Sequence, residues 1–224
     1  MNSADNLQLS HVLYRVQDLH KSVQKLQDAG FMVEYGTTPK KAYNALIWFE
    51  TGVFIEIHKS SGLSSPIKWL MKTLGYQSVL NRMHKWDDIE NGWCEWSLES
   101  TNVDLASQRT FFKELQIPFK FHKAKRKDDN RRTLRWELMM PGAIDFPFIM
   151  SAYRSNPRPQ SIRHPNGIQG VSNIIVGREN LDTVLLEKLM PQQSGLELVD
   201  GKKGLQTVEF INSKLTIEKI LQSK

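Results

Sequence analysis

A single cysteine, Cys94, occurs among the 224 residues of the chain, which excludes a framework of internal disulfides. Cys94 follows Trp93 in a strand-like run and has no basic neighbour, so a buried structural thiol fits better than a nucleophile. No apolar run approaches the ~20 residues of a membrane span, and residues 1–8 lack the basic and apolar segments of a secretory signal. These absences predict a cytoplasmic protein with no membrane partner.

Charge of one sign is only mildly in excess, with 30 Lys and Arg residues against 24 Asp and Glu residues and a net charge of +6. The stretch from Lys120 to Arg135 is an exception, because it holds eight of the basic residues. It lacks the interleaved aromatic residues or motif of a nucleic-acid site, so no nucleic-acid partner is expected. It is either a solvated hairpin tip or the source of one arginine, Arg132 or Arg135, that reaches over a cavity to hold an anion.

The region from Leu9 to Lys59 predicts a strand, a helix and three further strands. Its first strand places His11 among apolar residues, and the helix repeats Leu19, Val23 and Leu26 at a helical spacing. Gly52 can turn the last two strands into a hairpin. A βαβββ unit of this size cannot bury both faces of its sheet alone, so further copies are expected.

Two further copies can be aligned. A shift of 162 residues places the first unit on the C-terminal end without a gap, and a shift of 86 aligns its helix with the middle of the chain. The chain therefore divides into modules at residues 7–59, 92–153 and 171–222. Residues 60–91 predict a helical connector, either packed on the sheet or forming a lid over a cavity. Residues 154–170 hold three prolines and two glycines and predict an extended linker.

Repeated βαβββ modules with a histidine on the first strand and a glutamate on the last resemble the vicinal-oxygen-chelate superfamily. This superfamily includes glyoxalase I, extradiol dioxygenases and bleomycin-resistance proteins. The chain is most similar to its glyoxalase-like domain branch, over roughly residues 7–222. The resemblance implies an α+β fold whose repeated modules form curved, half-barrel mixed sheets. The residues that carry it are Leu9-Ser10-His11-Val12, Asn44, Phe54-Ile55-Glu56, Leu134-Arg135-Trp136, Phe146-Pro147-Phe148-Ile149 and His164-Pro165-Asn166-Gly167.

The resemblance also implies one divalent metal, because paired modules of this superfamily hold an ion with these histidines and glutamates. His11 and Glu56 match, and they suit zinc, nickel, manganese or iron. If the first module pairs with the third, Glu218 joins them as a metal ligand. If it pairs with the middle module, the matching positions are Ser97 and Met150, which do not suit a hard cation. The alignment favours neither pairing.

Plainer interpretations stand beside these. His11 is then a satisfied interior histidine, Glu56 its hydrogen-bonded partner and Glu218 an exposed carboxylate near the C-terminus. Asn44 either orders the loop before its strand or donates to a ligand. His164 either forms a turn or places an imidazole at the mouth of a cavity.

Three classes of function follow. The first is a metal-dependent lyase, isomerase or dioxygenase of glyoxalase type, and the second is a metal-free protein that binds or sequesters a small molecule, as bleomycin-resistance members do. The third is a structural module without a ligand. For a small-molecule ligand, the expected contacts come from Asn44, Arg132, Trp136 and His164. A homodimer is expected, because an odd number of modules leaves one without a partner.

Overall fold

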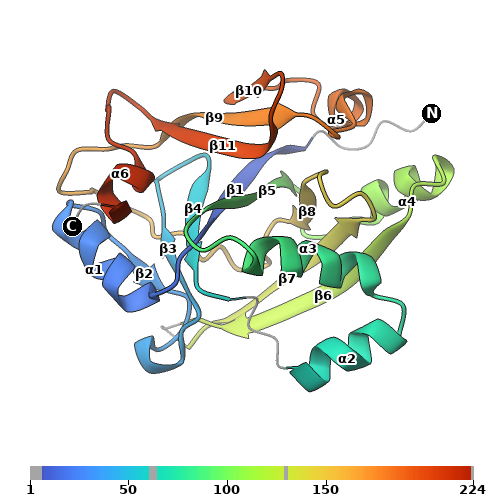
Figure 1. Ribbon diagram of the computed structural model, residues 1–224, viewed down its shortest axis with the longest axis horizontal. Helices are drawn as coiled ribbons and strands as arrows, with labels where there is room; N and C mark the ends of the chain where they lie inside the picture. The colour runs from blue at the N-terminus through green and yellow to red at the C-terminus, as the bar shows by residue number, and fades with distance from the viewer. Residues whose placement is uncertain (1–6, 61–64, 129–130, 223–224) are drawn as a thin grey trace.

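The structure is a computed structural model, and it describes residues 7–60, 65–128 and 131–222. Its strands form two sheets, an eight-stranded sheet in the order β2-β3-β4-β1-β5-β8-β7-β6 and a three-stranded sheet in the order β10-β9-β11. Figure 1 shows the large sheet strongly curled, with the small sheet lying across it and helices around both. The predicted fold class, α+β with a curved half-barrel mixed sheet, is confirmed.

The first module supplies half of the large sheet. Leu19, Val23 and Leu26 of its helix are buried as predicted, and the Asp18 carboxylate caps that helix by accepting a hydrogen bond of 3.0 Å from the backbone N–H of Lys21. The elements are β1 (Gln8–Arg15), α1 (Leu19–Asp28), β2 (Glu34–Tyr35), the short 3-10 helix η1 (Pro39–Lys41), β3 (Asn44–Ile47) and β4 (Phe54–His58).

The middle module supplies the other half. Strand β1 pairs antiparallel with its first strand, β5, so the two modules share one continuous sheet. This pairing decides between the two alternatives left open by the sequence, because the first module joins the middle one. The elements are β5 (Gly92–Ser100), α4 (Ala106–Glu114), β6 (Phe119–Lys127), β7 (Thr133–Pro141) and β8 (Phe148–Ser151).

The connector between these modules contains two helices, α2 (Ser65–Thr73) and α3 (Gln77–Asp87), and residues 61–64 of it lie outside the described residues. Helix α3 packs on the sheet through a buried ion pair, in which Arg82 Nη1 donates to Glu95 Oε2 at 2.6 Å with both side chains 1% exposed. The Trp86 indole donates to the same oxygen at 3.1 Å. These contacts hold α3 against β5.

The third module departs from the repeat at its end. It contains β9 (Val171–Arg178), α5 (Thr183–Leu189), β10 (Leu196–Val199), β11 (Lys203–Phe210) and α6 (Ile217–Gln222). The last strand predicted by the gap-free alignment is therefore wrong, because a helix stands there. Ile217 and Ile220, three residues apart, are both buried on one face of α6, which packs beside α1.

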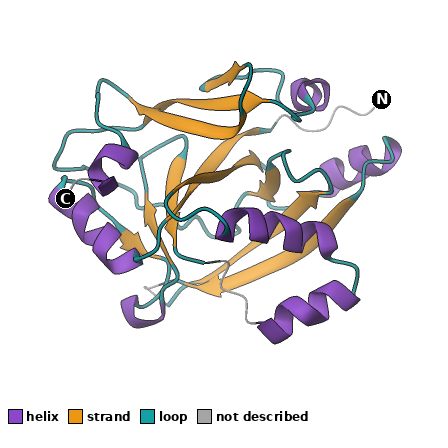
Figure 2. Cartoon of the chain, in the orientation of Figure 1, coloured by secondary structure: helices purple, strands orange, loops and turns teal. Residues whose placement is uncertain are grey.

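Most of the apolar core lies between the helix-covered face of the large sheet and the third module, and Val12, Tyr14 and Ile55 belong to it together with Ile174 and Leu186. Alternation along the strands therefore leaves the opposite face of β1 and β4 for a cavity. Figure 2 shows the helices arranged around the sheets, with α3 crossing the curled sheet. Within the described part of the chain, no helix is long and apolar enough to cross a membrane.

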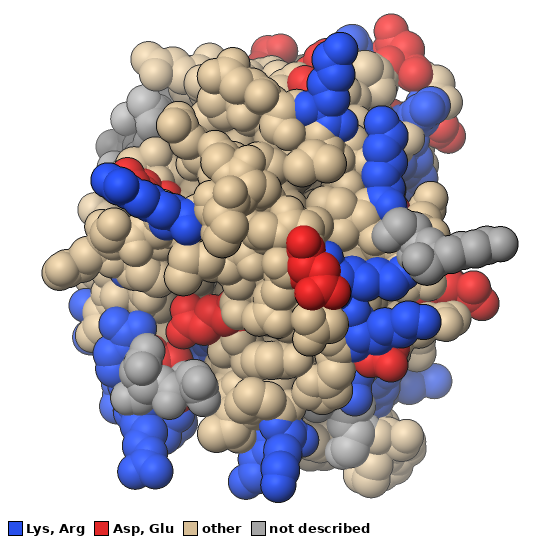
Figure 3. All heavy atoms as spheres, turned by 90° about the vertical axis from the view of Figure 1, so that its left-hand side faces the viewer, with Lys and Arg blue, Asp and Glu red and all other residues tan. Residues whose placement is uncertain are grey.

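The excess of basic residues is dispersed on the face that Figure 3 presents. Lys and Arg side chains there lie around a largely uncharged central area, and Asp and Glu side chains are interspersed with them.

Candidate functional site

A cavity of about 490 Å³ opens between the two halves of the large sheet. Strands β1, β3 and β4 line it from the first module, β6, β7 and β8 line it from the middle module, and Trp86 of α3 contributes to its wall. Of the residues predicted from the sequence, four line this cavity: His11, Asn44, Glu56 and Trp136.

His11 and Glu56 face each other in this cavity from neighbouring parallel strands. The His11 Nε2 atom lies 3.8 Å from Glu56 Oε2, and the two side chains are 7% and 20% exposed. The Asn44 side-chain amide donates to the other carboxylate oxygen, Oε1, at 2.9 Å. The imidazole also stacks on Phe54 with the ring centroids 4.5 Å apart. The pair is therefore fixed both by polar contacts and by ring packing.

The second ring nitrogen of His11 is satisfied by the middle module. His11 Nδ1 lies 2.8 Å from Ser97 Oγ and 3.1 Å from Ser10 Oγ. Burial lowers the pKa of His11 from 6.5 to about 4, more than the nearby Glu56 carboxylate raises it, and the Arg126 cation lowers it further. The imidazole is therefore neutral at pH 7.

The residues present do not provide the donor set of a metal centre. The middle module places Ser97 beside His11, and Met150 accepts a contact of 3.2 Å from the Ser10 hydroxyl at the position that matches Glu56. A hydroxyl and a thioether replace the imidazole and carboxylate that a hard divalent cation prefers. Among the described residues, no group of three His, Cys, Asp or Glu side chains is arranged to hold an ion. His11 and Glu56 alone form half a site.

Glu218 is not the missing ligand. It lies on α6, where its carboxylate accepts hydrogen bonds from the Trp93 indole and from Thr207 Oγ1. The Trp93 ring packs edge-on against Tyr14, on the core face of the large sheet, whereas His11 points from the other face. The prediction that Glu218 joins His11 in a metal site is corrected by this geometry, because the two side chains lie on opposite faces of the large sheet and Glu218 does not line the cavity of His11.

His164 also lies outside the cavity. Its Nδ1 accepts from the backbone N–H of Met32 at 2.9 Å, so its Nε2 carries the proton and donates to the Trp48 carbonyl at 3.0 Å. Both ring nitrogens are engaged with backbone, and the imidazole packs between Phe31 and Phe49. Burial lowers its pKa, which keeps it neutral. Of the two interpretations open for His164, the structure supports the structural one, because it ties the linker to the first module.

Arg132 is held at the hairpin instead of over the cavity. Its Nε donates to Asp128 Oδ2 at 2.6 Å and its Nη2 to the Pro157 carbonyl at 3.2 Å. The arginine that lines the cavity is Arg126, which the sequence analysis missed. Strand alternation was the signal that could have found it, since His122, Ala124 and Arg126 share the face of β6 that lines the cavity.

Arg126 is bound within the cavity wall by neutral groups. Its Nη1 donates to the Gly36 carbonyl at 3.1 Å, and its guanidinium is hydrogen-bonded to the Tyr153 hydroxyl. Burial raises the pKa of Tyr153 well above its ordinary value despite the opposing effect of Arg126, so the phenol is neutral. The Trp136 ring lies 5.1 Å from the Tyr153 ring and completes this wall.

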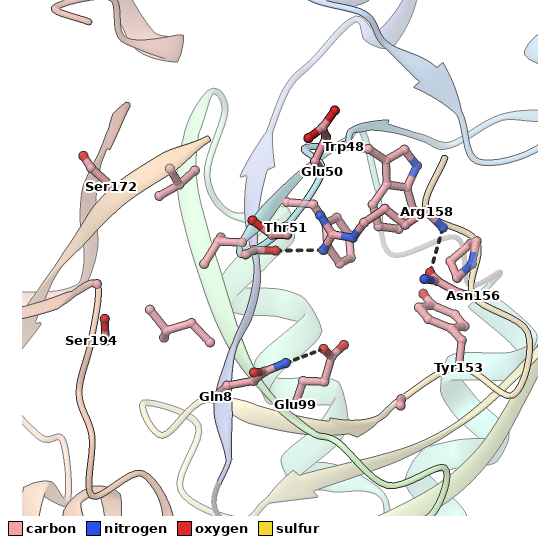
Figure 4. A pocket seen from close by; sticks show the side chains of 18 residues that line it. Gln8, Trp48, Glu50, Thr51, Glu99, Tyr153, Asn156, Arg158, Ser172 and Ser194 are labelled. Carbon is pink, nitrogen blue, oxygen red and sulfur yellow. Dashed lines mark hydrogen bonds between the residues drawn. The ribbon is translucent and has the colours of Figure 1, made fainter. Parts of the chain in front are cut away.

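A second, larger cavity of about 640 Å³ lies between the large sheet and the third module. Figure 4 shows Ser172 and Ser194 of the third module on one side of it and Tyr153 on the other. Two of its charged groups are engaged with the protein, because Glu99 accepts from Gln8 at 3.2 Å and Arg158 donates to the Gly52 carbonyl at 2.7 Å. None of the site residues predicted from the sequence lines this cavity. We therefore take the smaller cavity as the candidate site.

Comparison with known proteins agrees with this geometry. A two-module curled sheet with a histidine and a glutamate facing its cavity defines a member of the vicinal-oxygen-chelate superfamily. More narrowly, the chain belongs to the family described as "Glyoxalase-like domain", whose model matches residues 9–189.

Two solved structures show the same fold at low sequence identity. A hypothetical protein from Staphylococcus aureus has a TM-score of 0.63 and 13% identity, with 90% of each chain covered. The Mn(II)-bound glyoxalase from Novosphingobium aromaticivorans has a TM-score of 0.56 and 10% identity, covering 96% of this chain and 68% of that one. The search among curated proteins gave no match.

Proposed function

We propose that this protein binds a small organic molecule in the cavity between its first two modules, and that it does so without a metal ion. The observation that carries the proposal is the replacement of the second half of the metal site: Ser97 and Met150 stand where the superfamily places ligands. This corresponds to the metal-free binding class.

The cavity has the composition of a ligand site. Its walls are apolar and aromatic, and a few fixed polar groups project from its floor, which is the usual combination in small-molecule sites of about 300–1,000 Å³. Four of the polar groups, His11, Asn44, Glu56 and Arg126, are each held by neighbours. The others are His58, Ser60, His122 and Lys125. The aromatic members are Phe54, Trp86, Trp136, Phe148, Tyr43 and Tyr153.

Metal-dependent chemistry of glyoxalase type is the second candidate. It is favoured by the 3.8 Å approach of His11 to Glu56 and by the Mn(II)-bound glyoxalase among the structural neighbours. The two candidates make opposite predictions about the metal content of the purified protein.

Elemental analysis of protein purified without added metal tests this difference, with His11→Ala and Glu56→Ala measured beside the wild type. Our proposal expects the same low metal content, well below one ion per chain, in all three proteins. About one ion per chain in the wild type, lost in both variants, would establish the second candidate and overturn metal independence.

A screen for ligands tests the cavity itself. Compounds that bind it should raise the melting temperature of the wild type by mass action but not that of Ala124→Trp, which fills the cavity from β6. Val184→Trp, at a position 61% exposed on α5, is the matched control and should respond like the wild type. If every stabilising compound acts equally on Ala124→Trp, ligands bind elsewhere and the proposal fails.

A further inference from the structure

Arg126 brings a positive charge into the cavity and makes no direct ion pair there, although the Glu34 carboxylate lies near enough to interact with its charge. Among the residues that the structure describes, no carboxylate lies within 4.0 Å of its guanidinium. Its protein partners are neutral, the Gly36 carbonyl and the Tyr153 hydroxyl. Its Nε–H is buried without an acceptor. Arg126 is half-buried, and a guanidinium without an ion pair is suited to an anionic ligand.

The remaining charges of the lining do not supply that partner. Glu56 is the one carboxylate among the described residues that line the cavity, and Asn44 and His11 hold it on the floor. Lys125 also lines the cavity and adds a second cation. Burial lowers the pKa values of His11 and His58, which favours the neutral form of both side chains. At pH 7 the lining therefore carries more positive than negative charge.

The body of the ligand must match walls that are flat and apolar. Trp136 packs with Tyr153 beside the guanidinium, and Leu138 and Met140 follow Trp136 on the same face of β7. The Phe148 and His11 rings pack edge-to-face in the cavity lining, with their centroids 5.3 Å apart. Aromatic and thioether side chains suit a planar ring system.

We infer that the ligand of this cavity is an aromatic carboxylate, whose carboxylate binds Arg126 and whose rings lie against Trp136. This inference rests on the proposed function, because it names the class of molecule that the cavity binds. A carboxylate accepts the planar array of guanidinium N–H groups in two parallel hydrogen bonds, including the one that Nε lacks in the protein. The Arg126 guanidinium, a fixed cation, then anchors the ligand in place of a metal ion.

The experiment compares aryl carboxylates of one to three rings with their neutral primary amides, by quenching of tryptophan fluorescence at pH 7. The amides keep the shape and ring area but lack the charge. Because a hydrogen bond to a charged group contributes about twice as much as a neutral one, we expect at least one acid to bind the wild type about 10- to 100-fold more tightly than its amide. Raised salt should reduce this ratio.

Variants locate the preference. Arg126→Gln should abolish the ratio between acid and amide, because it weakens binding of the acid more than binding of the amide. Lys127→Gln removes the same charge at an exposed neighbour on β6 and should keep the ratio. The wild-type ratio itself requires no variant, so the test does not depend on Arg126→Gln folding.

Each outcome decides one claim. Equal binding of acids and amides, blocked in Ala124→Trp, would overturn the inference about charge and leave the proposed function standing. The same acid preference in Arg126→Gln as in the wild type would overturn the role of Arg126. Failure of every acid and amide to bind at millimolar concentration would overturn the aromatic class, and the ligand screen with Ala124→Trp would then decide the proposed function independently.

Discussion

Acidification should destabilise this protein through His11. The pKa of His11 is about 4 in the folded protein and 6.5 when the side chain is free in water, so between these values the unfolded chain binds a proton that the folded chain excludes. The free energy of unfolding therefore falls as the pH drops from about 6.5 to 4, and this group causes no further loss below that range. At about 1.4 kcal/mol for each pKa unit, the difference corresponds to about 3 kcal/mol between pH 7 and pH 4.

The substitution His11→Asn isolates this contribution. Asparagine keeps a polar side chain beside Ser97 but does not titrate, so the variant should lose about 3 kcal/mol less than the wild type over the same pH range. Urea unfolding followed by tryptophan fluorescence at pH 7 and pH 4 measures both losses. His58 and His164 also have lowered pKa values, and they are present in both proteins, so their contributions cancel in the comparison.

Equal losses in the two proteins would refute the reasoning, because they would mean that His11 is protonated in the folded state without penalty. That result would place the imidazole in contact with water or in a stable ion pair with Glu56. A larger loss in His11→Asn would have the same meaning.

The remaining predictions concern stability, the cavity wall, the cysteine and the assembly. Arg82→Met should lower the free energy of unfolding by about 3–5 kcal/mol in urea titrations, because it leaves the buried Glu95 carboxylate without its cation; a loss under 1 kcal/mol would contradict this. Gly36→Ala should weaken binding of any ligand of the cavity and lower the melting temperature, since its Cβ would lie 2.1 Å from Asn44 Oδ1; unchanged calorimetric titrations would refute it. Cys94 should resist thiol reagents until the protein unfolds, because burial raises its pKa well above the ordinary value. The expected homodimer predicts a mass of about twice 25.9 kDa by light scattering, and a monomeric mass would exclude it.

The sequence was a good guide to features that depend on near neighbours. The spacing of Leu19, Val23 and Leu26 defined the buried face of α1, because residues three and four apart meet on a helix. Alternation along β4 puts Glu56 and His58, two residues apart, on one face, and both line the cavity. The family resemblance, resting on the order of such elements, supplied the α+β half-barrel.

The sequence was a poor guide where distant segments decide the outcome. The alignment predicted a strand where α6 stands, because it compared apolar residues one at a time. A helix there buries both Ile217 and Ile220 on the face that packs beside α1. The sequence left open that His164 lines a cavity, but in the structure both its ring nitrogens are hydrogen-bonded to the backbone, of Met32 and of Trp48.

By itself, the sequence indicated the βαβββ pattern of the first module, with His11 on its first strand and Glu56 on its last. Only the tertiary structure decided that the first module pairs with the middle one, which sets Ser97 and Met150 opposite that pair and excludes Glu218. It also brought Arg126 into the cavity. The physical reason is that periodicity indicates which face a residue occupies, whereas the pairing of β1 with β5, 77 to 91 residues away along the chain, decides what that face contacts.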